Sequence, residues 1–381
     1  MAQADILIRN GRVIDCCNGI DQTDSIAVSN GRIVSAKGIT HASQVIDAAG
    51  CIVIPGMIDA HTHIGSIGSD LGVMPDSICF PSGVTTVIDA GTSGVASYRA
   101  FRMMCESSFV RIKCLLNVSS TGLTTTRYPE NIDPALFDRK RILSDIEQYS
   151  DQIIGLKLRL DQMVAKDAAL CKAALEETLD IADAAGHGIV VIHPTRSPMP
   201  QEQILRALRK GDVYAHVFQN KGCPVVNADG VLPFVTQAQR RGVQIDAANG
   251  RSHFDYTLAE HALRHGFLPD LISSDITAKV AYQYPLVFSL PFILSKYLHL
   301  GVPLTELVQR VTLAPARLLG QERELGSLSE GTVADIAILR LIDKEVDLFD
   351  SQGIVRHANR LIKPEMTIRE GQTVFRQIDF C

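Results

Sequence analysis

The sequence predicts an α/β fold: a (β/α)8 TIM barrel with a small composite β-sandwich domain attached. In the middle of the chain, eight apolar runs of strand length alternate with stretches of helical periodicity. At both ends, short strand-like runs are separated by turn signals. The length of 381 residues suits one large barrel with attachments. We therefore expect residues 55–320 to form the barrel, and residues 1–54 plus 321–381 to form the composite domain.

The N-terminal segment is predicted to contain strands joined by tight turns. Asn10-Gly11 and Asn30-Gly31 each lie between apolar residues. Asn-Gly is a strong hairpin signal, because both central positions of a type I′ turn need a positive φ. The C-terminal segment has the same character, with Glu370-Gly371 between two strand-like runs. We expect the two ends to pack together, since they flank a middle of different character.

The middle of the chain supplies the predicted barrel strands and helices. The strand-like runs are 57–61, 84–90, 112–118, 153–160, 188–193, 213–218, 243–247 and 271–275. The clearest helix is predicted over 167–185, with Gly186 as its stop signal, and another over 305–319. Strands that alternate with helices in this way favour a parallel barrel sheet.

Composition and charge exclude several classes of protein. Hydrophobic residues make up 46% and charged residues 21%, which is ordinary for a globular chain and excludes disorder, collagen and coiled coil. The net charge of −5, without a dense basic run, argues against nucleic acid or an anionic membrane as a partner. No transmembrane span and no signal peptide are apparent. The 9 scattered cysteines favour free thiols in a reducing, cytoplasmic setting.

Residues typical of metal sites lie on five of the eight predicted strands, toward the ends where barrel enzymes place their catalytic groups. His61 and His63 come first, two residues apart at the end of the first strand. On a strand, that spacing directs both imidazoles to the same side, so they can hold one ion. The alternative is a pair of polar loop residues. The apolar strand entry at 54–59 favours the ligand pair.

Lys157 lies in the fourth predicted strand, between leucines. The leucines suit packing against helices, so the Lys157 side chain would point into the barrel, where an unpaired ammonium is very costly. Burial depresses the pKa of a lysine, and a neutral amine can capture carbon dioxide as a carbamate. A carbamate has two oxygens and can bridge two cations. The alternatives are a salt bridge to an interior aspartate, or a side chain that reaches solvent.

Three further residues end other predicted strands: His193 the fifth, His216 the sixth and Asp275 the eighth. A single histidine at such a position is more often a hydrogen-bonded core residue. Two at corresponding barrel positions favour a second metal site. Asp275 can be a helix N-cap, but beside a metal it becomes a ligand and a proton acceptor.

This ordered set of six residues resembles the binuclear metal centre of the amidohydrolase superfamily. Residues 53–63 are similar to the entry signature of that superfamily, and residues 326–335 resemble its return strand into the small β-domain. The phrases at 82–87 and 89–94 look like the dihydroorotase-like amidohydrolase/deacetylase subgroup. Dihydroorotases typically carry arginine at the position of Gly65, and purine-type deaminases usually carry glutamate at that of Arg196.

The resemblance implies a hydrolase with two divalent metal ions, and the nitrogen-rich ligand set favours zinc. The implied ligands are His61, His63 and Asp275 for one ion, and His193 and His216 for the other. A hydroxide and the carbamate formed from Lys157 and carbon dioxide would bridge the ions. Asp275 would take the proton from the hydroxide and pass it to the leaving nitrogen or oxygen.

The expected reaction is hydrolysis of an amide or ester bond in a small molecule. The substrate would be an N-acyl or O-acetyl amino or hydroxy acid, or a cyclic amide. One alternative is a deaminase that releases ammonia from a heterocycle, and another is a catalytically silent barrel used for assembly. The complete ligand set disfavours the silent barrel. A homo-oligomer is expected only by analogy with the fold.

Substrate contacts are expected from loops at the catalytic rim. The candidates are Arg127, Tyr128, Arg196, Arg251 and His253. An arginine can hold a substrate carboxylate by a forked contact. Tyr128 or His253 can donate a hydrogen bond to the carbonyl oxygen. The alternative for each candidate is a solvated loop residue.

Overall fold

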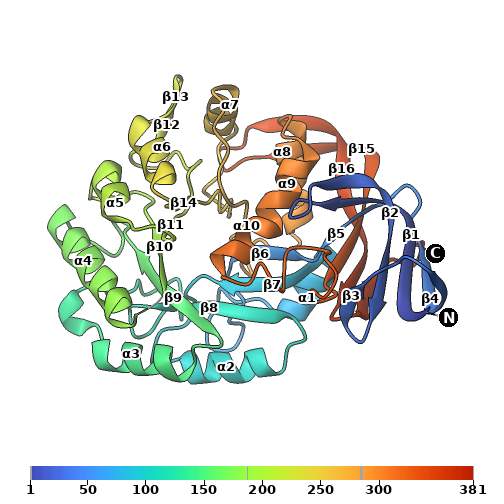
Figure 1. Ribbon diagram of the computed structural model, residues 1–381. Coiled ribbons are helices and arrows are strands. Elements are labelled where there is room, and N and C mark those ends of the chain that lie inside the picture. The colour runs from blue at the N-terminus through green and yellow to red at the C-terminus, as the bar shows by residue number, and fades with distance from the viewer. Residues whose placement is uncertain (1, 187, 284–285, 381) are drawn as a thin grey trace.

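The computed structural model describes residues 2–186, 188–283 and 286–380, which form two large sheets surrounded by helices (Figure 1). One sheet curls into the barrel. The other contains strands from both ends of the chain, and blue and red strands lie side by side in it in Figure 1. Helices α2 to α6 lie along the outside of the barrel sheet.

The barrel sheet has seven parallel strands within the described ranges, in the order β6, β7, β8, β9, β10, β11, β14. Their bounds are β6 Met57–Thr62, β7 Val84–Asp89, β8 Arg111–Asn117, β9 Ile153–Arg159, β10 Ile189–His193, β11 Val213–Tyr214 and β14 Gln244–Ile245. All seven lie within or overlap the predicted runs. Parallel neighbours need long crossover connections, which explains the helices between them.

Residues 271–276 close the barrel between β14 and β6 without forming a regular strand. Two isolated parallel bridges join this segment to its neighbours, Leu271 to Asp246 and Ile276 to Thr62. The prediction of a regular strand over 271–275 is therefore wrong, although the segment lies where that strand was expected. Asp275 has a left-handed backbone with a φ of 49°, which no continuous strand can contain. The hydroxyl of Ser273 donates to the Asp246 carboxylate, so side chains replace part of the ladder.

The helices follow the predicted pattern with one break. Their bounds are α1 Pro75–Cys79, α2 Tyr98–Glu106, α3 Arg139–Gln148, α4 Ala168–Ala184, α5 Gln201–Ala207, α6 Pro233–Arg240, α7 Tyr256–Arg264, α8 Leu290–His299, α9 Leu304–Val311 and α10 Leu313–Leu318, with 3-10 turns at η1 Phe80–Ser82 and η2 Pro134–Leu136. Asp167 caps α4, as its position predicts. The single helix predicted over 305–319 breaks at Thr312, because Pro315 has no N–H for the carbonyl one turn earlier.

The second sheet joins the two chain ends. Its strands are β1 Ala2–Asp15, β2 Ile20–Ser29, β3 Arg32–Val34, β4 Ile39–Asp47, β5 Ile52–Pro55, β15 Ile336–Phe349, β16 Val355–Arg369 and β17 Gln372–Arg376. β5 is the junction, because it pairs with β1 on one side and with β15 on the other. The expected pairing of the two β-rich ends is thus present. A separate small hairpin is formed by β12 Val226–Asn227 and β13 Gly230–Val231.

One of the two predicted Asn-Gly turns is correct. Asn30 and Gly31 connect β2 to β3, with φ values of 51° and 73°. Asn10 and Gly11 do not turn the chain: β1 runs through them with a register shift after Ile8. Asn10 has a φ of 64°, and a Cβ on Gly11 would lie 2.5 Å from a Val53 methyl carbon. The left-handed residue here forms a bulge in a strand that β5 packs against tightly.

The barrel interior is a packed layer below the site. Val191, Leu115, Ile88 and Leu271 belong to one buried cluster drawn from different strands. Val191 lies two residues before His193 on β10, so their side chains are on the same face. The apolar layer fills the barrel beneath its C-terminal end, and the polar side chains come one layer higher.

Lys296 in α8 is a buried cation between the barrel and the C-terminal strands. Its Nζ donates to the Leu286 carbonyl at 2.5 Å and to the Phe349 carbonyl at 2.6 Å. Burial lowers the pKa of Lys296 to about 7, since desolvation penalises the ammonium. The unfolded chain titrates this lysine near 10.5 and so binds more protons between these two values. Stability should therefore rise with pH across that window.

The Lys296→Met variant tests this linkage. We expect the melting temperature of the native protein, relative to that of the variant, to increase from pH 7 to pH 10. Over this range the buried Lys296 amine of the native protein is losing its proton and therefore its desolvation penalty, whereas the variant has no amine at this position. Differential scanning fluorimetry at matched ionic strength measures both proteins. A difference between the two that stays constant over this range would contradict a depressed Lys296 pKa.

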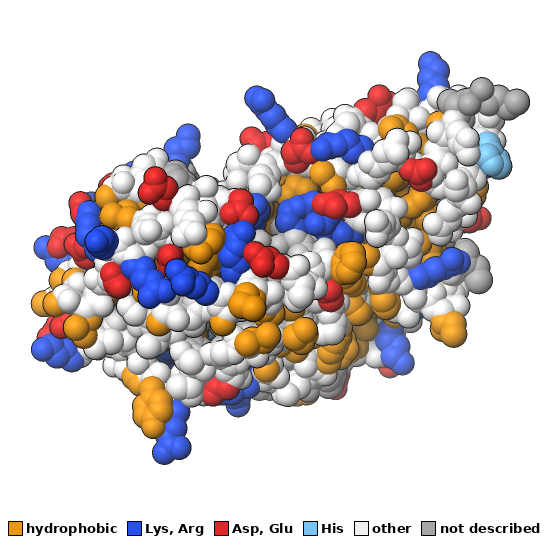
Figure 2. All heavy atoms as spheres, turned by 90° about the horizontal axis from the view of Figure 1, so that it is seen from below, with side chains coloured by type: hydrophobic (Ala, Val, Ile, Leu, Met, Phe, Trp, Pro, Cys, Tyr) orange, Lys and Arg blue, Asp and Glu red, His pale blue; other side chains and the backbone are white. Residues whose placement is uncertain are grey.

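The surface is mixed in charge. Figure 2 shows Lys and Arg side chains interspersed with Asp and Glu side chains over the face seen from below. Among the described helices, none has both the length and the apolar character needed to cross a bilayer.

Candidate metal centre

The first ligand group lies where β6 meets the closing segment 271–276. His61 is near the end of β6 and His63 directly follows it, so both rings emerge at the C-terminal end of the sheet. Asp275 Oδ1 lies 3.3 Å from His63 Nε2 and 3.8 Å from His61 Nε2. All three residues are buried, and one donor atom from each lies within 4.8 Å of the others. The predicted pair and the predicted aspartate thus converge on one point.

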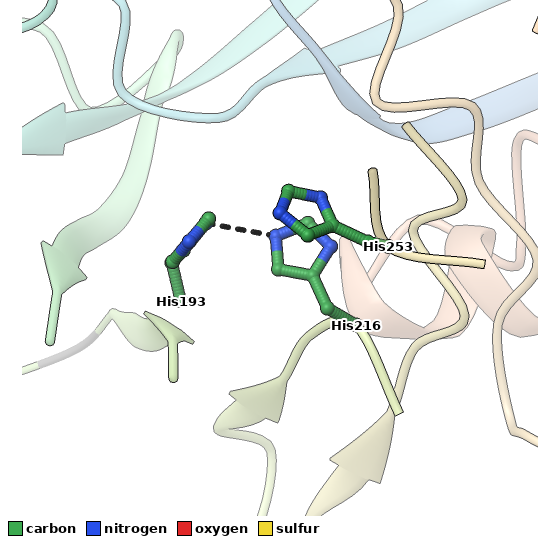
Figure 3. A group of neighbouring side chains, drawn as sticks. All are labelled: His193, His216 and His253. Carbon is green, nitrogen blue, oxygen red and sulfur yellow. Dashed lines mark hydrogen bonds between the residues drawn. The ribbon is translucent and has the colours of Figure 1, made fainter. Parts of the chain in front are cut away.

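The second ligand group consists of three histidines, shown in Figure 3. His193 ends β10, and His216 follows β11 with a φ of 63°. The His216 Nε2 and His193 Nδ1 atoms are 2.9 Å apart, and the His253 ring lies 3.9 Å from the His216 ring, centroid to centroid. His253, expected as a substrate contact, thus lies among possible ligands. As a lone histidine in a loop it has no spacing partner, so the sequence contains no metal signal for it.

Lys157 in β9 lies beside the first group. Its Nζ is 3.2 Å from His61 Nε2, and its side chain is buried. Burial lowers the pKa of Lys157 to about 8, although the charges of Asp275 and Asp246 oppose this shift. Among the described residues no carboxylate forms an ion pair with Lys157, so the salt-bridge alternative is not observed. A buried amine without such a partner is a candidate for reaction in its neutral form.

Asp275 is held as an anion at the junction of the two groups. Its Oδ2 lies 3.3 Å from His253 Nδ1, while Oδ1 faces His63. Burial by itself raises the carboxyl pKa, but the hydrogen bond with His253 and the other histidine rings around the carboxylate outweigh it, and the pKa of Asp275 falls well below its usual range. A Cβ on Gly250 would lie 2.1 Å from Asp275 Oδ2. Only glycine leaves room for the carboxylate here.

Hydrogen bonds behind the rings set which nitrogen of each histidine faces the site. Thr92 donates its hydroxyl proton to Asp89 at 2.7 Å and must therefore accept from His63 Nδ1 at 3.0 Å. His216 Nδ1 donates to the Ala248 carbonyl at 2.7 Å. In both cases Nε2 keeps its lone pair and points into the ligand group.

His61 has a different support. Its Nδ1 lies 3.6 Å from an Asp246 oxygen, and this buried nitrogen has no hydrogen-bond partner among the described residues. Both Asp246 oxygens accept from the Ser273 hydroxyl, at 2.7 and 2.8 Å. Burial raises the pKa of Asp246 to about 7. His61 is therefore a buried imidazole whose polar atoms are incompletely satisfied by the protein.

The donor set fits divalent cations. Burial, joined by nearby positive charge, lowers the pKa of His61, His193 and His216 well below the ordinary value, so their rings are neutral and can act as ligands. Imidazole nitrogens with one carboxylate suit zinc and similar ions. His61 Nε2, which lies 3.2 Å from Lys157 Nζ and 3.8 Å from Asp275 Oδ1, is the ring nitrogen that would hold a cation in the first group.

A cavity of about 280 Å³ lies over both groups. His63, Lys157, His193, His253 and Asp275 line it, so the two ligand groups and the lysine face one space. The cavity also contains a ring of charged residues that the sequence did not single out: Arg159, Lys221, Lys279, Glu130 and Asp161. Arg159 lies two residues after Lys157 on β9, and that spacing is the one signal by which it could have been found.

The expected substrate contacts divide into two sets. Arg196, Arg251 and His253 line the cavity. Arg127 and Tyr128 are exposed on the loop after β8 and are not among the described lining residues. The Arg127 guanidinium lies 6.0 Å from the centre of the Tyr128 ring. Their part in substrate binding stays a prediction.

Gly91 sets the position of Lys157. It has a φ of 81°, and a Cβ there would lie 2.4 Å from Lys157 Cβ. We expect Gly91→Ala to displace the lysine and to weaken metal binding and activity by about 10- to 100-fold, as changes behind metal ligands do. Metal titration and steady-state rates measure this. Gly301→Ala is the matched control, because Gly301 has a φ of 87° but nothing within 4 Å of the added Cβ. Equal losses in the two variants would mean that only backbone strain matters.

Comparison with known proteins agrees with this geometry. The amidohydrolase family matches residues 52–374. Deacetylase Atu3266 of Agrobacterium fabrum is 30% identical over 374 residues, covering 96% of this chain and 90% of that protein. A crystal structure of an adenine deaminase has a TM-score of 0.89 and 29% identity, covering 98% of this chain and 100% of the other. A dihydroorotase structure has a TM-score of 0.86 and 28% identity, covering 97% and 98%.

The family match spans most of the chain, and the deacetylase is similar over nearly its whole length. The expected fold is that of the similar structures, with a parallel sheet that curls into a barrel. The chain therefore belongs to the amidohydrolase family.

Proposed function

We propose that the protein is a metal-dependent hydrolase that cleaves an amide or ester bond of a small acylated amino or hydroxy acid, or of a cyclic amide. One observation carries the proposal: two groups of buried ligand atoms, with a buried amine beside them, face a single cavity at the C-terminal end of the barrel sheet. Barrel enzymes place their chemistry at that end. The deacetylase relative supports an acyl substrate.

The site is proposed to hold two divalent cations, with zinc favoured by the nitrogen-rich ligands. We assign His61, His63 and Asp275 to one cation, and His193 and His216 to the other. Lys157 would take up carbon dioxide at Nζ and release a proton, and the resulting carbamate would supply one oxygen to each ligand group. Bound divalent cations lower the pKa of water and polarise a carbonyl.

The chain's own residues move the proton and orient the groups. Asp275 is anionic at neutral pH, so it can accept a proton from the attacking water and deliver it to the leaving nitrogen or oxygen. His253, whose Nδ1 lies 3.3 Å from Asp275 Oδ2, would orient that carboxylate. His253 also lines the cavity, and in the tautomer with the proton on Nε2 it could instead donate to the substrate carbonyl.

A heterocycle deaminase is the second candidate function. The similarity to an adenine deaminase structure over the whole chain favours it. Arg196, three residues after His193, opposes it, since a guanidinium at that position cannot act as the general acid that a carboxylic acid would supply. A silent barrel is disfavoured, because the ligand set is complete.

The remaining proposals concern the surroundings of the site. We propose that residues 1–54 and 321–381 form one β-sandwich domain and residues 55–320 the barrel domain. We also propose a cytoplasmic protein that acts on a small molecule, without nucleic acid or membrane as partner. The described cysteines, all free thiols, support the reducing compartment.

Metal removal and a substrate screen test the proposed function. We expect elemental analysis to find about two divalent ions per chain and a chelator to abolish hydrolysis, because the cations activate the water. Zinc should restore it. A panel of acylated amino and hydroxy acids is assayed for acid release, and adenine and related heterocycles for ammonia release. Full activity in metal-free protein would contradict the proposal, and ammonia release alone would favour the deaminase.

A further inference from the structure

The cavity over the metal centre carries more positive than negative side chains. Apart from the metal-centre residues, its charged lining consists of Arg159, Arg196, Lys221, Arg251 and Lys279 against Glu130 and Asp161. Both acids already have partners. Glu130 pairs with Arg159 at 3.0 Å, and Asp161 lies 3.1 Å from Arg196 and 3.7 Å from Arg159. The two acids therefore balance two of the five cations.

The other three cations have no acidic partner among the described residues. Within the ranges that the structure describes, no ion pair involves Lys221, Arg251 or Lys279. Lys279 donates to the Thr126 hydroxyl at 3.2 Å instead. Unbalanced positive charge in a partly enclosed cavity costs free energy unless a bound anion offsets it.

Arg196, Lys221 and Arg251 come from three neighbouring loops, and we call them the basic cluster. Arg196 follows β10, Lys221 follows β11 and Arg251 follows β14, which are adjacent in the barrel sheet. Burial lowers the pKa of Lys221, and the nearby charges of Arg196 and Arg251 lower it further. Like charges thus gather on one side of the cavity.

The cavity wall beside the basic cluster is tightly packed and contains buried polar atoms that lack hydrogen-bond partners among the described residues. Arg196 has a left-handed backbone with a φ of 54°, and a Cβ on Gly222 would lie 2.9 Å from its Cα, so the two loops are in direct contact. Thr195 lines the cavity and is 1% exposed, and its hydroxyl has no partner among the described residues. The buried Nε atoms of Arg196 and Arg159 also lack partners there. Guanidinium groups only donate hydrogen bonds, so a ligand with hydrogen-bond acceptor atoms would complement this wall.

We propose that the basic cluster binds two negative charges of the substrate, supplied by a phosphate monoester or by two carboxylates, held apart from the acyl bond that the metal centre attacks. The inference rests on the proposed hydrolase function and narrows its substrate class to dianionic acyl compounds. Arg196 is already paired with Asp161, so a single carboxylate would leave one of Lys221 and Arg251 unbalanced, and a neutral heterocycle would leave both unbalanced. Lys221 and Arg251 are the specificity-determining residues in this assignment.

Binding of simple anions tests the basic cluster without any knowledge of the substrate. Isothermal titration of the zinc-loaded enzyme uses inorganic phosphate, succinate and acetate as probes. We expect phosphate or succinate to bind at least about tenfold more tightly than acetate, as charge-assisted hydrogen bonds predict. Lys221→Met should remove this preference and Lys221→Arg should keep it, both at unchanged metal content. Lys172→Met, at an exposed α4 position, is the control of equal charge change.

Three results would overturn the proposal: equal affinity for acetate and both dianions, dianion binding that survives in Lys221→Met, or the same loss in Lys172→Met. The first two would mean that the metal ions alone attract the anion. The phosphate and succinate arms separate the two candidate groups, because a site shaped for phosphate should prefer it to succinate.

Matched substrates separate this inference from the proposed function. N-acetylaspartate is compared with N-acetylasparagine, and N-acetylphosphoserine with N-acetylserine, at equal metal loading. Preference for the more negatively charged member of either pair by about tenfold in kcat/KM supports the basic cluster. Equal turnover of the more highly charged and the singly charged members would overturn the inference and leave the hydrolase intact. Absence of bound metal and of hydrolysis in every pair would count against the hydrolase, while the anion titrations would still decide the basic cluster.

Discussion

The Lys157→Ala enzyme is expected to lose about a thousandfold or more in kcat/KM, because a correctly held cation contributes several kcal/mol to charge stabilisation. Lys157 Nζ lies 3.2 Å from His61, beside the first ligand group and facing the cavity shared with the second. A carbamate there would neutralise part of the charge of both cations, so its loss should also lower the metal content. The fold should survive, since removal of this amine leaves no carboxylate without an ion-pair partner.

Metal analysis and steady-state hydrolysis measure the two effects together. A small carboxylate such as formate or propionate, added to the Lys157→Ala enzyme, should restore part of the activity by occupying the vacated space. Lys172→Ala is the control, because among the described residues Lys172 pairs only with Glu176 on the surface of α4. Normal activity and normal metal content in Lys157→Ala would show that the lysine does not bridge.

Asp275→Asn is expected to reduce kcat by about 10²- to 10⁴-fold, the range for loss of a general base, while much of the metal stays bound. The amide oxygen can still face His63, but it cannot accept a proton at neutral pH. Asparagine also tolerates the left-handed backbone that Asp275 adopts at a φ of 49°. The loss should therefore be chemical and leave the local structure in place.

The proton-transfer role predicts a changed pH profile. The pKa of Asp275 is held well below the ordinary value of 3.8, so the acid limb that follows its protonation should lie below that pH in the native kcat profile and should be missing in Asp275→Asn. Metal content is measured in parallel, and Asp229→Asn, an exposed position beside β13, is the matched control. Unchanged turnover with full metal content would contradict the role of Asp275 as base.

Positions tied to strand ends could be predicted from the sequence. The spacing of His61 and His63 on β6 follows from the two-residue period of a strand, and the buried place of Lys157 follows from its apolar neighbours. His193 ends β10 and His216 lies two residues after β11, so both are near strand ends, where the sequence placed them. The structure brings these residues together because parallel strands in one barrel end at the same rim.

Features that depend on tertiary context could not be predicted. His253 lies in a loop, and only the folded chain shows that it contacts His216 and Asp275. Asn10 has the sequence of a turn, but pairing on both sides of β1 extends the strand through it. Apart from Arg159, which ends β9, the ring of charges around the cavity comes from loops without shared spacing, so no local pattern reveals those residues.

Residues 271–276 meet β6 through a few contacts in place of a continuous ladder. The Asp275 amide donates to the His61 carbonyl at 2.7 Å, and the His63 amide donates to the Ile276 carbonyl at 3.0 Å. A cation held by the side chains of His61, His63 and Asp275 would link the same two edges, adding its binding free energy to the closure. These two amide protons should then exchange slowly with solvent deuterium in loaded protein and faster after stripping. Metal release and opening of the barrel at this edge would be one coupled event.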